Sequence, residues 1–513
     1  MKENNVMRAT TAVMAVTLLS RLLGFVRQSM IASIYGANQT VDIYFTASDF
    51  FIGVSAAFTT ALTAALVNIY IRVRLNNGEK QANRTASGMM TFYFLFGIAA
   101  VGLFVLAAPL LARILAPGYD AAGLAELTKF LRIYSLALIF SGFQSILAAV
   151  LNARNSFVPA NLYGLIYNPL AIIMMLFGSQ NLGIYAVVIA YIIGNLIQLA
   201  VMNGFCHGQV RLCVPAFSPE IRQILWLSLP LLLSNILLQC NHVVDKVICN
   251  LLGEGMVSAY AYAYALEQFV TAAFSLTVGQ VLYSTFTDLA AKGDHDNMQK
   301  MLEKALGMLV LILWPVLLVS FIASGDIVRI VYMRGSFTET AAVNTQLALM
   351  GFAVGFPIVA VREIYVRVHL AYQNSKRAMT AGAAEVLINT VLSIFLAMVL
   401  KERGWGIFGI ALATSLSALL SIFLLNRSVR RYLPRFRLMN LRVTFLKILA
   451  AGAVCTAVII VTGKIPCGRL PGFVLQSVAG IGVYIAMLSA MRCEEIYQAA
   501  RMIKKRFSRK TIE

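Results

Sequence analysis

The chain has 513 residues, of which 59% are hydrophobic and only 12% are charged. Soluble domains carry roughly a quarter charged residues, so this composition excludes a soluble globular protein. The formal net charge of +20 does not indicate nucleic-acid binding, because the basic residues cluster in alternate segments between long apolar runs, as the positive-inside rule expects.

Apolar runs long enough to cross about 30 Å of hydrocarbon recur along the whole chain. They predict an all-α, multi-pass membrane protein with fourteen transmembrane helices. The Lys2 and Arg8 segment resembles the start of a signal peptide, but Arg21 interrupts the apolar run that follows, so we expect a retained first helix. The predicted spans are residues 10–34, 42–71, 88–112, 129–152, 157–177, 183–205, 224–252, 256–284, 302–332, 341–371, 378–400, 406–426, 443–463 and 472–491.

The distribution of Lys and Arg predicts the orientation in the membrane. With the N-terminus inside, the inner segments hold 27 basic residues and the outer segments hold nine. This bias places both termini in the cytoplasm, in what we expect to be the bacterial cytoplasmic membrane. The basic stretch at 427–442 and the tail at 504–510 are interpreted as topology signals that contact anionic lipid headgroups, in preference to a dedicated partner site.

The order of the spans predicts four parts. "LLS" occurs at 18–20 and again at 232–234, and each copy is followed by an outer turn with a glycine, Gly36 or Gly253. A period of six helices is a common transporter plan. We therefore predict two six-helix lobes around a central cationic cavity, a C-terminal helical pair and a basic tail. Their ranges are 1–223, 224–442, 443–491 and 492–513.

Two arginines lie inside the first span. Arg21 and Arg27 are six residues apart, so they are separated by about 9 Å along a helix and by roughly 120° around it. Charges in a membrane span usually face a protein interior or a wet cavity. One interpretation is that Asp42 or Asp49 neutralises an arginine and locks two helices together. The other is a cationic cavity for an anionic substrate, since the planar guanidinium binds two phosphate oxygens at once.

Further charges lie in other spans. Lys246 and Arg362 are candidates to line the same cavity from the second half, and Glu267 is a candidate acidic cavity residue. Asp245 is expected to compensate its neighbour Lys246. Lys447 lies near the inner end of its span and is expected to extend its ammonium group to the membrane surface.

Several motifs resemble the lipid II flippase family (MurJ, also called MviN) of the multidrug/oligosaccharidyl-lipid/polysaccharide exporter superfamily. Ser20, Arg21, Gly24, Arg27, Gly36, Asp42, Tyr44 and Phe45 match the family's opening signature, which is fairly specific. Weaker matches are LNARNSFVPA (151–160), VGQVLYSTFTDLAAKGD (278–294), GSFTET (335–340) and GIALATSLSA (409–418), so the resemblance covers nearly the whole chain.

The resemblance implies a V-shaped pair of lobes, with spans 13 and 14 forming a lipid-facing groove. It also implies transport of an undecaprenyl-pyrophosphate-linked saccharide by alternating access, together with contacts to membrane lipids and to the cell-wall synthesis machinery. Arg21, Arg27 and Asp42 carry over as cavity residues, with the arginines contacting the pyrophosphate.

The chain departs from the family pattern at two places. The second span lacks the family's midway arginine and reads GVSAAF at 53–58. The eighth span often carries Ala-Asp-Arg-Leu, whereas this chain has Ala-Tyr-Ala-Leu at 263–266. Lys246 and Arg362 are candidates to compensate. The substrate therefore stays open between lipid II and another lipid-linked saccharide.

Other function classes are disfavoured. A cation-coupled exporter of small molecules would favour acids over arginines in its cavity, and span 1 has the opposite. A polyprenyl-phosphate enzyme would need a reactive acid or histidine near an interface. Glu363 and His369 are the candidate pair, but a spacing of six residues places them on different helix faces.

A P-loop and a His-Glu-x-x-His motif are absent, the seven cysteines form no Cys-x-x-Cys pair, and the four histidines are scattered. We therefore expect no catalytic residues, no metal site and no cofactor. The expected energy source is the membrane potential or a monovalent ion.

Overall fold

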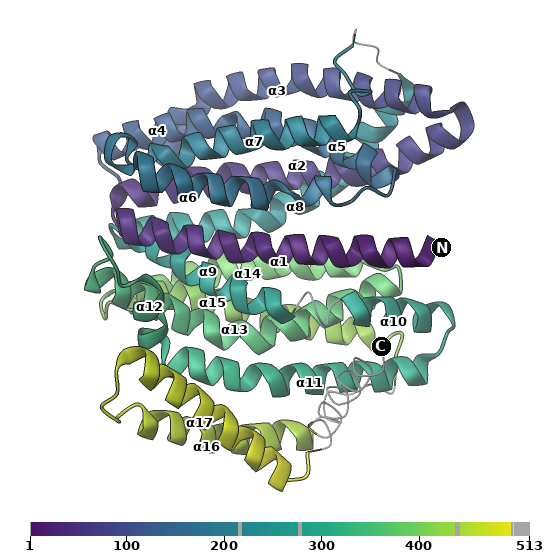
Figure 1. Cartoon of the computed structure of the whole chain (residues 1–513). Helices are drawn as coiled ribbons and strands as arrows, with labels where there is room; N and C mark the ends of the chain where they lie inside the picture. The colour runs from purple at the N-terminus through teal and green to yellow at the C-terminus, as the bar shows by residue number, and fades with distance from the viewer. Residues whose placement is uncertain are drawn as a thin grey trace. The chain divides into compact units, whose positions relative to one another are not determined.

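The computed structural model describes residues 2–213, 218–274, 280–434, 436, 442–493 and 496, and these residues form helices and no strands (Figure 1). The helices are α1 (Lys2–Tyr35), α2 (Gln39–Asn77), α3 (Glu79–Leu115), α4 (Ala121–Ser135), α5 (Ala137–Ala153), α6 (Tyr163–Leu182), α7 (Tyr185–Phe205), α8 (Pro219–Leu252), α9 (Met256–Phe274), α10 (Gln280–Ala291), α11 (His295–Ile322), α12 (Ser324–Tyr332), α13 (Glu339–Ala371), α14 (Ser375–Lys401), α15 (Gly406–Val429), α16 (Arg442–Thr462) and α17 (Arg469–Ala490), with a 3-10 helix at Pro159–Asn161.

The helices confirm a multi-pass membrane protein. Within the described part of the chain, 11 helical segments are long and apolar enough to cross a membrane, counting α4 with α5 and the 3-10 helix with α6. The predicted spans at 10–34 and 224–252 fall on α1 and α8, and the span at 256–284 covers α9 and the first residues of α10, with 275–279 outside the described residues. The count of fourteen spans stays a prediction.

Two predicted spans are each interrupted. The span at 129–152 consists of α4 and α5, with a break at Leu136, and the span at 302–332 falls on α11 and α12, with a break at Ala323. At each break a serine hydroxyl donates to the carbonyl three residues earlier: Ser135 to Arg132 at 2.6 Å, and Ser324 to Phe321 at 3.0 Å. A break at a single residue changes the average hydropathy of a span very little, which is why apolar composition alone did not reveal the breaks.

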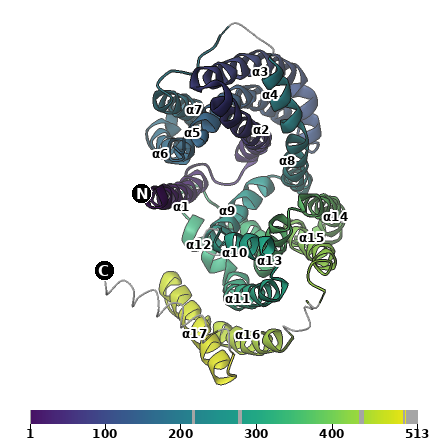
Figure 2. The same cartoon turned by 90° about the vertical axis from the view of Figure 1, so that its right-hand side faces the viewer.

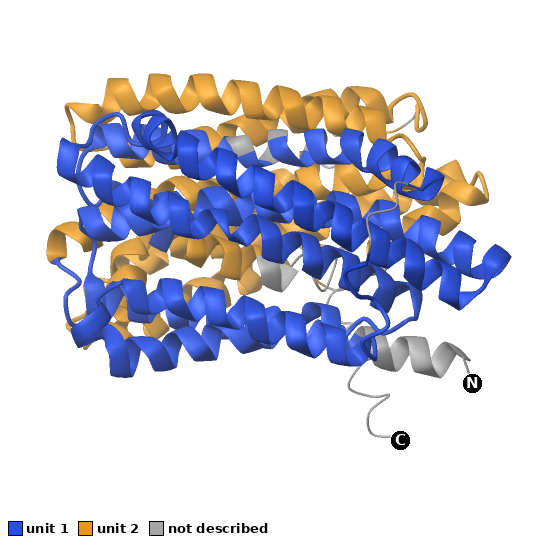
Figure 3. Ribbon diagram, turned by 90° about the horizontal axis from the view of Figure 1, so that it is seen from above, with its two compact units in different colours: residues 1–262, 334–338 blue, residues 263–333, 339–513 orange. Residues whose placement is uncertain are grey.

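The chain divides into two compact units, shown in different colours in Figure 3. Unit 1 comprises residues 1–262 and 334–338, and unit 2 comprises residues 263–333 and 339–513. In unit 1, α2 packs against α5 and α8, and α1 packs against α6. In unit 2, α15 packs between α13 and α14. Helix α8 packs along α2, so it belongs to the same compact unit as α1 to α7. The predicted lobe boundary after residue 223 rests on the counting of spans and stays a prediction.

The C-terminal pair packs together within unit 2. Helices α16 and α17 lie side by side (Figure 2) and both contact α11. The hydroxyl of Tyr484 on α17 donates to the carbonyl of Leu311 on α11 at 3.0 Å. Residues 435 and 437–441 of the basic stretch, and the tail after residue 496, lie outside the described residues.

A short segment at 334–338 fixes the end of α1 in unit 1. The backbone N–H of Ser336 donates to the carbonyl of Ser33 at 2.7 Å. Gly335 adopts a φ of +58°, and a Cβ atom there would lie 2.2 Å from the same carbonyl oxygen. Glycine is therefore required, because any side chain would both strain the backbone and collide with α1. This contact holds the helix that carries Arg21 and Arg27.

Candidate functional site

Arg27 on α1 is held by an aromatic side chain. Its Nη1 donates to the hydroxyl of Tyr167 on α6, and its guanidinium carbon lies 4.7 Å from the centre of the same ring. Its Nε is buried and makes no hydrogen bond within the described structure. Among the described residues, no carboxylate forms an ion pair with Arg27. The positive charge is thus stabilised by a ring face and a neutral hydroxyl.

Four tyrosines from three helices lie around Arg27, and a fifth, from α7, packs against three of them; we call all five the tyrosine cage: Tyr44, Tyr134, Tyr163 and Tyr167 around the arginine, and Tyr191 behind them. The rings contact one another. Tyr163 and Tyr167 stack with centroids 5.5 Å apart, and Tyr191 meets Tyr134 at 5.2 Å and Tyr167 at 5.7 Å. The cage supplies hydroxyl groups without any formal negative charge.

Sequence reasoning missed the cage. Tyr163 and Tyr167 are four residues apart in YGLIYNP, a spacing that places both rings on one helix face, and this signal was available. The other three tyrosines are distant in sequence, and only tertiary packing brings them together.

Arg21 lies less than two turns before Arg27 on α1. Its side chain is exposed, and within the described residues it makes no hydrogen bond or ion pair. The two acids that could have neutralised α1 both have other partners. The structure therefore does not favour the interpretation in which Asp42 or Asp49 locks an arginine.

Asp42 caps a helix. Its side chain is fully buried near the start of α2, and its two carboxylate oxygens accept the backbone N–H groups of Gly255 and Ser258, each at 2.7 Å. These donors belong to the N-terminal end of α9, where backbone N–H groups lack helical partners and the helix dipole favours an anion. The geometry gives Asp42 a structural task in unit 1; its expected role as a cavity residue stays a prediction.

Lys246 on α8 pairs with Asp49 on α2. It also donates to the carbonyl of Phe45 at 3.4 Å, and its ammonium lies 5.9 Å from the centre of the Phe45 ring. The expected pairing with its neighbour Asp245 is not what the structure shows, because adjacent helical residues point about 100° apart. Asp245 instead accepts the hydroxyl of Tyr260 at 3.0 Å.

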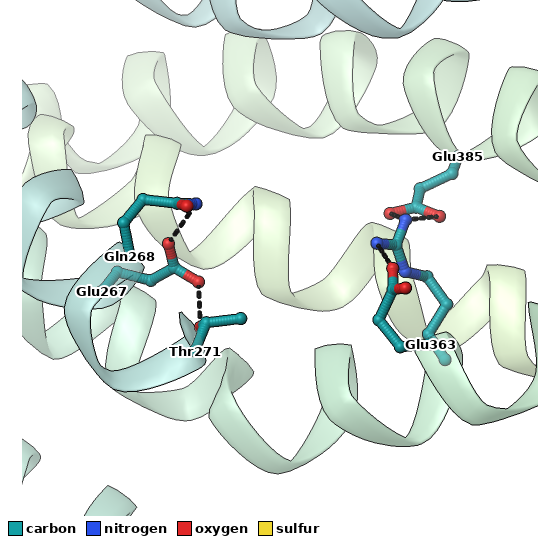
Figure 4. Close-up of polar contacts among 6 residues, drawn as sticks. Glu267, Gln268, Thr271, Glu363 and Glu385 are labelled. Atoms are coloured by element: carbon teal, nitrogen blue, oxygen red, sulfur yellow. Dashed lines mark hydrogen bonds and ion pairs between the residues drawn. The ribbon is translucent and has the colours of Figure 1, made fainter. Parts of the chain in front are cut away.

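Arg362 on α13 sits between two carboxylates in unit 2. Its Nη1 lies 3.0 and 3.1 Å from the oxygens of Glu385 on α14, and its Nη2 lies 2.6 Å from Glu363. Figure 4 shows Glu363 and Glu385 converging on this guanidinium from two helices. Its Nε is buried without a hydrogen bond. This cluster has more negative than positive charge, unlike the surroundings of Arg27.

Glu267 on α9 is buried in unit 2. Its carboxylate accepts the hydroxyl of Thr271 at 2.7 Å and the amide of Gln268 at 2.9 Å (Figure 4). All three residues lie on one helix, so Glu267 is partly satisfied locally. Its expected place in a central cavity stays a prediction.

Packing contacts occupy both places where the chain departs from the family pattern. A Cβ atom on Gly53 of α2 would lie 3.2 Å from the side-chain oxygen of Gln239 on α8, so α2 and α8 approach closely there. Tyr264 packs on Phe352 of α13 with ring centroids 5.8 Å apart. Since Lys246 and Arg362 both have acidic partners in their own units, neither offers an uncompensated charge to replace the missing family residues.

The candidate enzymatic pair is not assembled within the described structure. His369 is fully buried and its Nδ1 lies 2.8 Å from the carbonyl oxygen of Tyr365, while Glu363 pairs with Arg362. Across the described residues, no group of three or more His, Cys, Asp or Glu side chains is placed to hold a metal ion.

Solved structures share this fold. A structure described as lipid II flippase MurJ in an inward closed conformation aligns with a TM-score of 0.82 at 24% identity, covering 94% of this chain and 99% of the other. An inward-facing multidrug resistance MATE family transporter of the MOP superfamily aligns with a TM-score of 0.69 at 12% identity, covering 82% and 98%. This chain therefore has the same multi-pass helical fold as these two structures.

Sequence relatives narrow the class to one family. A probable lipid II flippase MurJ of Rickettsia prowazekii is 27% identical over 80% of this chain and 81% of its own length. Another, from Thermotoga maritima, is 25% identical over 94% and 96%. The family described as lipid II flippase MurJ matches residues 31–475. This chain belongs to the MurJ family of lipid II flippases.

Proposed function

We propose that this chain moves lipid II, the undecaprenyl-pyrophosphate-linked precursor of peptidoglycan, from the inner to the outer leaflet of the bacterial cytoplasmic membrane by alternating access. The observation that carries the proposal is the setting of Arg27, a charge inside a membrane helix that no carboxylate of the described structure neutralises. Membership of the family supports the substrate.

The chemistry of Arg27 suits a diphosphate. A guanidinium held by neutral groups keeps its full charge for a ligand, and its planar fork can donate two hydrogen bonds to one phosphate. The tyrosine hydroxyls add neutral donors at the same place. Arg21, exposed on the same helix, supplies a second positive charge for the second phosphate.

The polyprenyl tail needs an apolar surface that faces lipid. Helices α16 and α17 carry exposed apolar side chains along their length, including Leu446, Val461, Val474 and Val478. We propose that the tail lies along this pair while the headgroup crosses, so the hydrocarbon never leaves an apolar environment.

The orientation with both termini in the cytoplasm is part of the proposal and rests on the distribution of basic residues. An inside-negative potential acts on a moving charge with about 2.3 kcal/mol per 100 mV, enough to return an empty, arginine-bearing site inward. We further propose coupling to this potential or to a monovalent ion, transport without chemical change of the substrate, and contact with the cell-wall synthesis machinery. Flipping in vesicles at two imposed potentials tests the coupling; equal rates would exclude the potential as the driver.

The main test uses cells depleted of their own lipid II flippase. Wild type, Arg27→Ala and Arg132→Ala are expressed at equal levels, and the lipid II accessible from outside is measured. Arg132 is a matched control because it is exposed on α4, outside the tyrosine cage. We expect rescue by wild type and by Arg132→Ala, and loss of at least about tenfold with Arg27→Ala, the effect of one charge-assisted hydrogen bond.

Either other outcome revises the proposal. No rescue by a well-expressed, membrane-inserted wild type would favour another lipid-linked saccharide as substrate, in line with the two uncharged family positions. Full rescue by Arg27→Ala would remove Arg27 from the mechanism.

A further inference from the structure

A small pocket in unit 2 is lined by three arginines. It has a volume of about 250 Å³ and lies between the first turns of α14 and the last turn of α15, where Arg377, Arg427 and Arg431 surround it. Among the described residues, no acidic side chain lines it, and none of the three guanidinium groups makes a hydrogen bond or ion pair. Three like charges at one small site repel one another, and an anion would relieve that repulsion.

A buried hydroxyl marks the same pocket. Ser428 lines it and is only 8% exposed, and its Oγ makes no hydrogen bond in the described structure. A buried polar group without a partner costs free energy, so a ligand atom that bonded this hydroxyl would be favoured. Thr380 also lines the pocket from α14, but its hydroxyl already donates to the carbonyl of Arg377 at 3.0 Å. Three guanidinium groups and the Ser428 hydroxyl therefore form the donor set that a phosphate would meet.

An exposed apolar surface lies beside the pocket. From Arg377 and Thr380, the same face of α14 continues through Leu387, Val391 and Met398, which are 69%, 66% and 68% exposed. On α15, Phe423 lies one turn from Arg427 and is 61% exposed. A ligand with a phosphate in the pocket and hydrocarbon tails on this apolar face would match both surfaces.

We propose that this arginine pocket binds the phosphate of an anionic phospholipid in the cytoplasmic leaflet. It rests on the proposed orientation, which places this end of α14 and α15 inside, and it is independent of which substrate the protein carries. A single basic residue near an anionic membrane surface acts diffusely. A pocket with a buried hydroxyl would instead hold one lipid at a fixed position on unit 2.

Native mass spectrometry of the purified full-length protein tests this site. The probes are phosphatidylglycerol, neutral phosphatidylcholine, and glycerol 3-phosphate as a phosphomonoester without tails. The pocket variant is Arg427→Gln with Arg431→Gln. The matched control is Lys376→Gln with Arg430→Gln, which removes the same charge from exposed neighbours that do not line the pocket.

We expect tight phosphatidylglycerol binding by wild type, weakened about fivefold for each pocket arginine removed and less than about twofold by the control pair. Ser428→Ala, which changes no charge and is a minimal change in volume, should weaken binding about threefold. It keeps the test informative if the arginine variant unfolds.

Three results would overturn the proposal. Equal weakening of binding by the control pair would show that the pocket arginines act only as diffuse surface charge. Equal binding of phosphatidylcholine would show that the site does not select an anionic lipid, because the choline of that headgroup cancels the charge of its phosphate. Glycerol 3-phosphate binding as tightly as the lipid, with the same arginine dependence, would identify a soluble phosphate site. Because the assay involves no lipid II, it stands or fails separately from the transport test.

Discussion

Arg27 in unit 1 and Arg362 in unit 2 are both arginines in the interior of a predicted membrane span, and their surroundings differ in charge. Arg27 is bound by the hydroxyl and ring of Tyr167, whereas Arg362 contacts the carboxylates of Glu363 and Glu385. An ion pair compensates the arginine before any ligand arrives, while a ring of tyrosines leaves its charge available. The comparison indicates that unit 2 uses its arginine to join helices and that unit 1 holds its arginine ready for an anion.

The largest effect should come from breaking the unit 2 cluster. Arg362→Ala leaves two carboxylates close together, of which Glu385 is 12% exposed, and we expect a loss of about 3 kcal/mol in the free energy of unfolding. Thermal unfolding in detergent measures it. Arg362→Gln combined with Glu385→Gln should recover most of the loss, because no uncompensated pair of charges remains. An Arg362→Ala protein as stable as wild type would contradict the structural role.

The next largest effect is expected at Asp42, which the sequence analysis considered as an ion-pair partner for an arginine of α1. Asp42→Asn exchanges one acceptor oxygen for an amide that faces a backbone N–H, so we expect a loss of about 2 kcal/mol in stability. Glu254→Gln is the matched control, since the exposed Glu254 accepts a single backbone N–H, from Gln39, at 3.1 Å. A transport defect in Asp42→Asn without any loss of stability would favour a cavity role over a capping role.

A smaller effect should separate charge from shape at Arg27. Arg27→Lys keeps the positive charge but loses the planar fork, so lipid II flipping should fall about tenfold with unchanged stability. The two readouts are the outside-accessible lipid II in depleted cells and thermal unfolding of the purified variant. Activity equal to wild type would show that Arg27 acts as a point charge.

The smallest effect should come from the cage itself. Tyr167→Phe removes the hydroxyl that accepts Nη1 of Arg27 but keeps the ring beneath it. One neutral hydrogen bond contributes about 1 kcal/mol, so flipping should fall about fivefold. Tyr185→Phe on α7, whose ring contacts Phe130 outside the cage, serves as the control. Equal effects of the two changes would contradict a specific role for the cage.

Much of the fold followed from hydropathy, because burial in lipid imposes long apolar runs that any chain must show. The breaks at Leu136 and Ala323 did not follow, since an interruption of one residue leaves no trace in an average over apolar residues. An arginine inside an apolar helix could be predicted to need polar surroundings, and the structure supplies them around Arg27.

The partners of the charged residues were harder to predict. Lys246 pairs with Asp49, nearly two hundred positions away along the chain, and not with its neighbour Asp245. Asp42 binds backbone groups, which every residue possesses and which no motif distinguishes. Sequence reasoning could identify which residues need compensation, whereas only packing selects the groups that provide it.

The cap that Asp42 places on α9 has a consequence for biosynthesis. The carboxylate and its partner Gly255 are separated by 213 residues, and ribosomes add roughly 5–20 residues per second. The acid at the start of α2 therefore waits on the order of ten to forty seconds before its partners exist. During that interval it must stay at the water interface or be shielded by the insertion machinery. Formation of this contact between α2 and α9 is thus a late event, set by the arrival of α9.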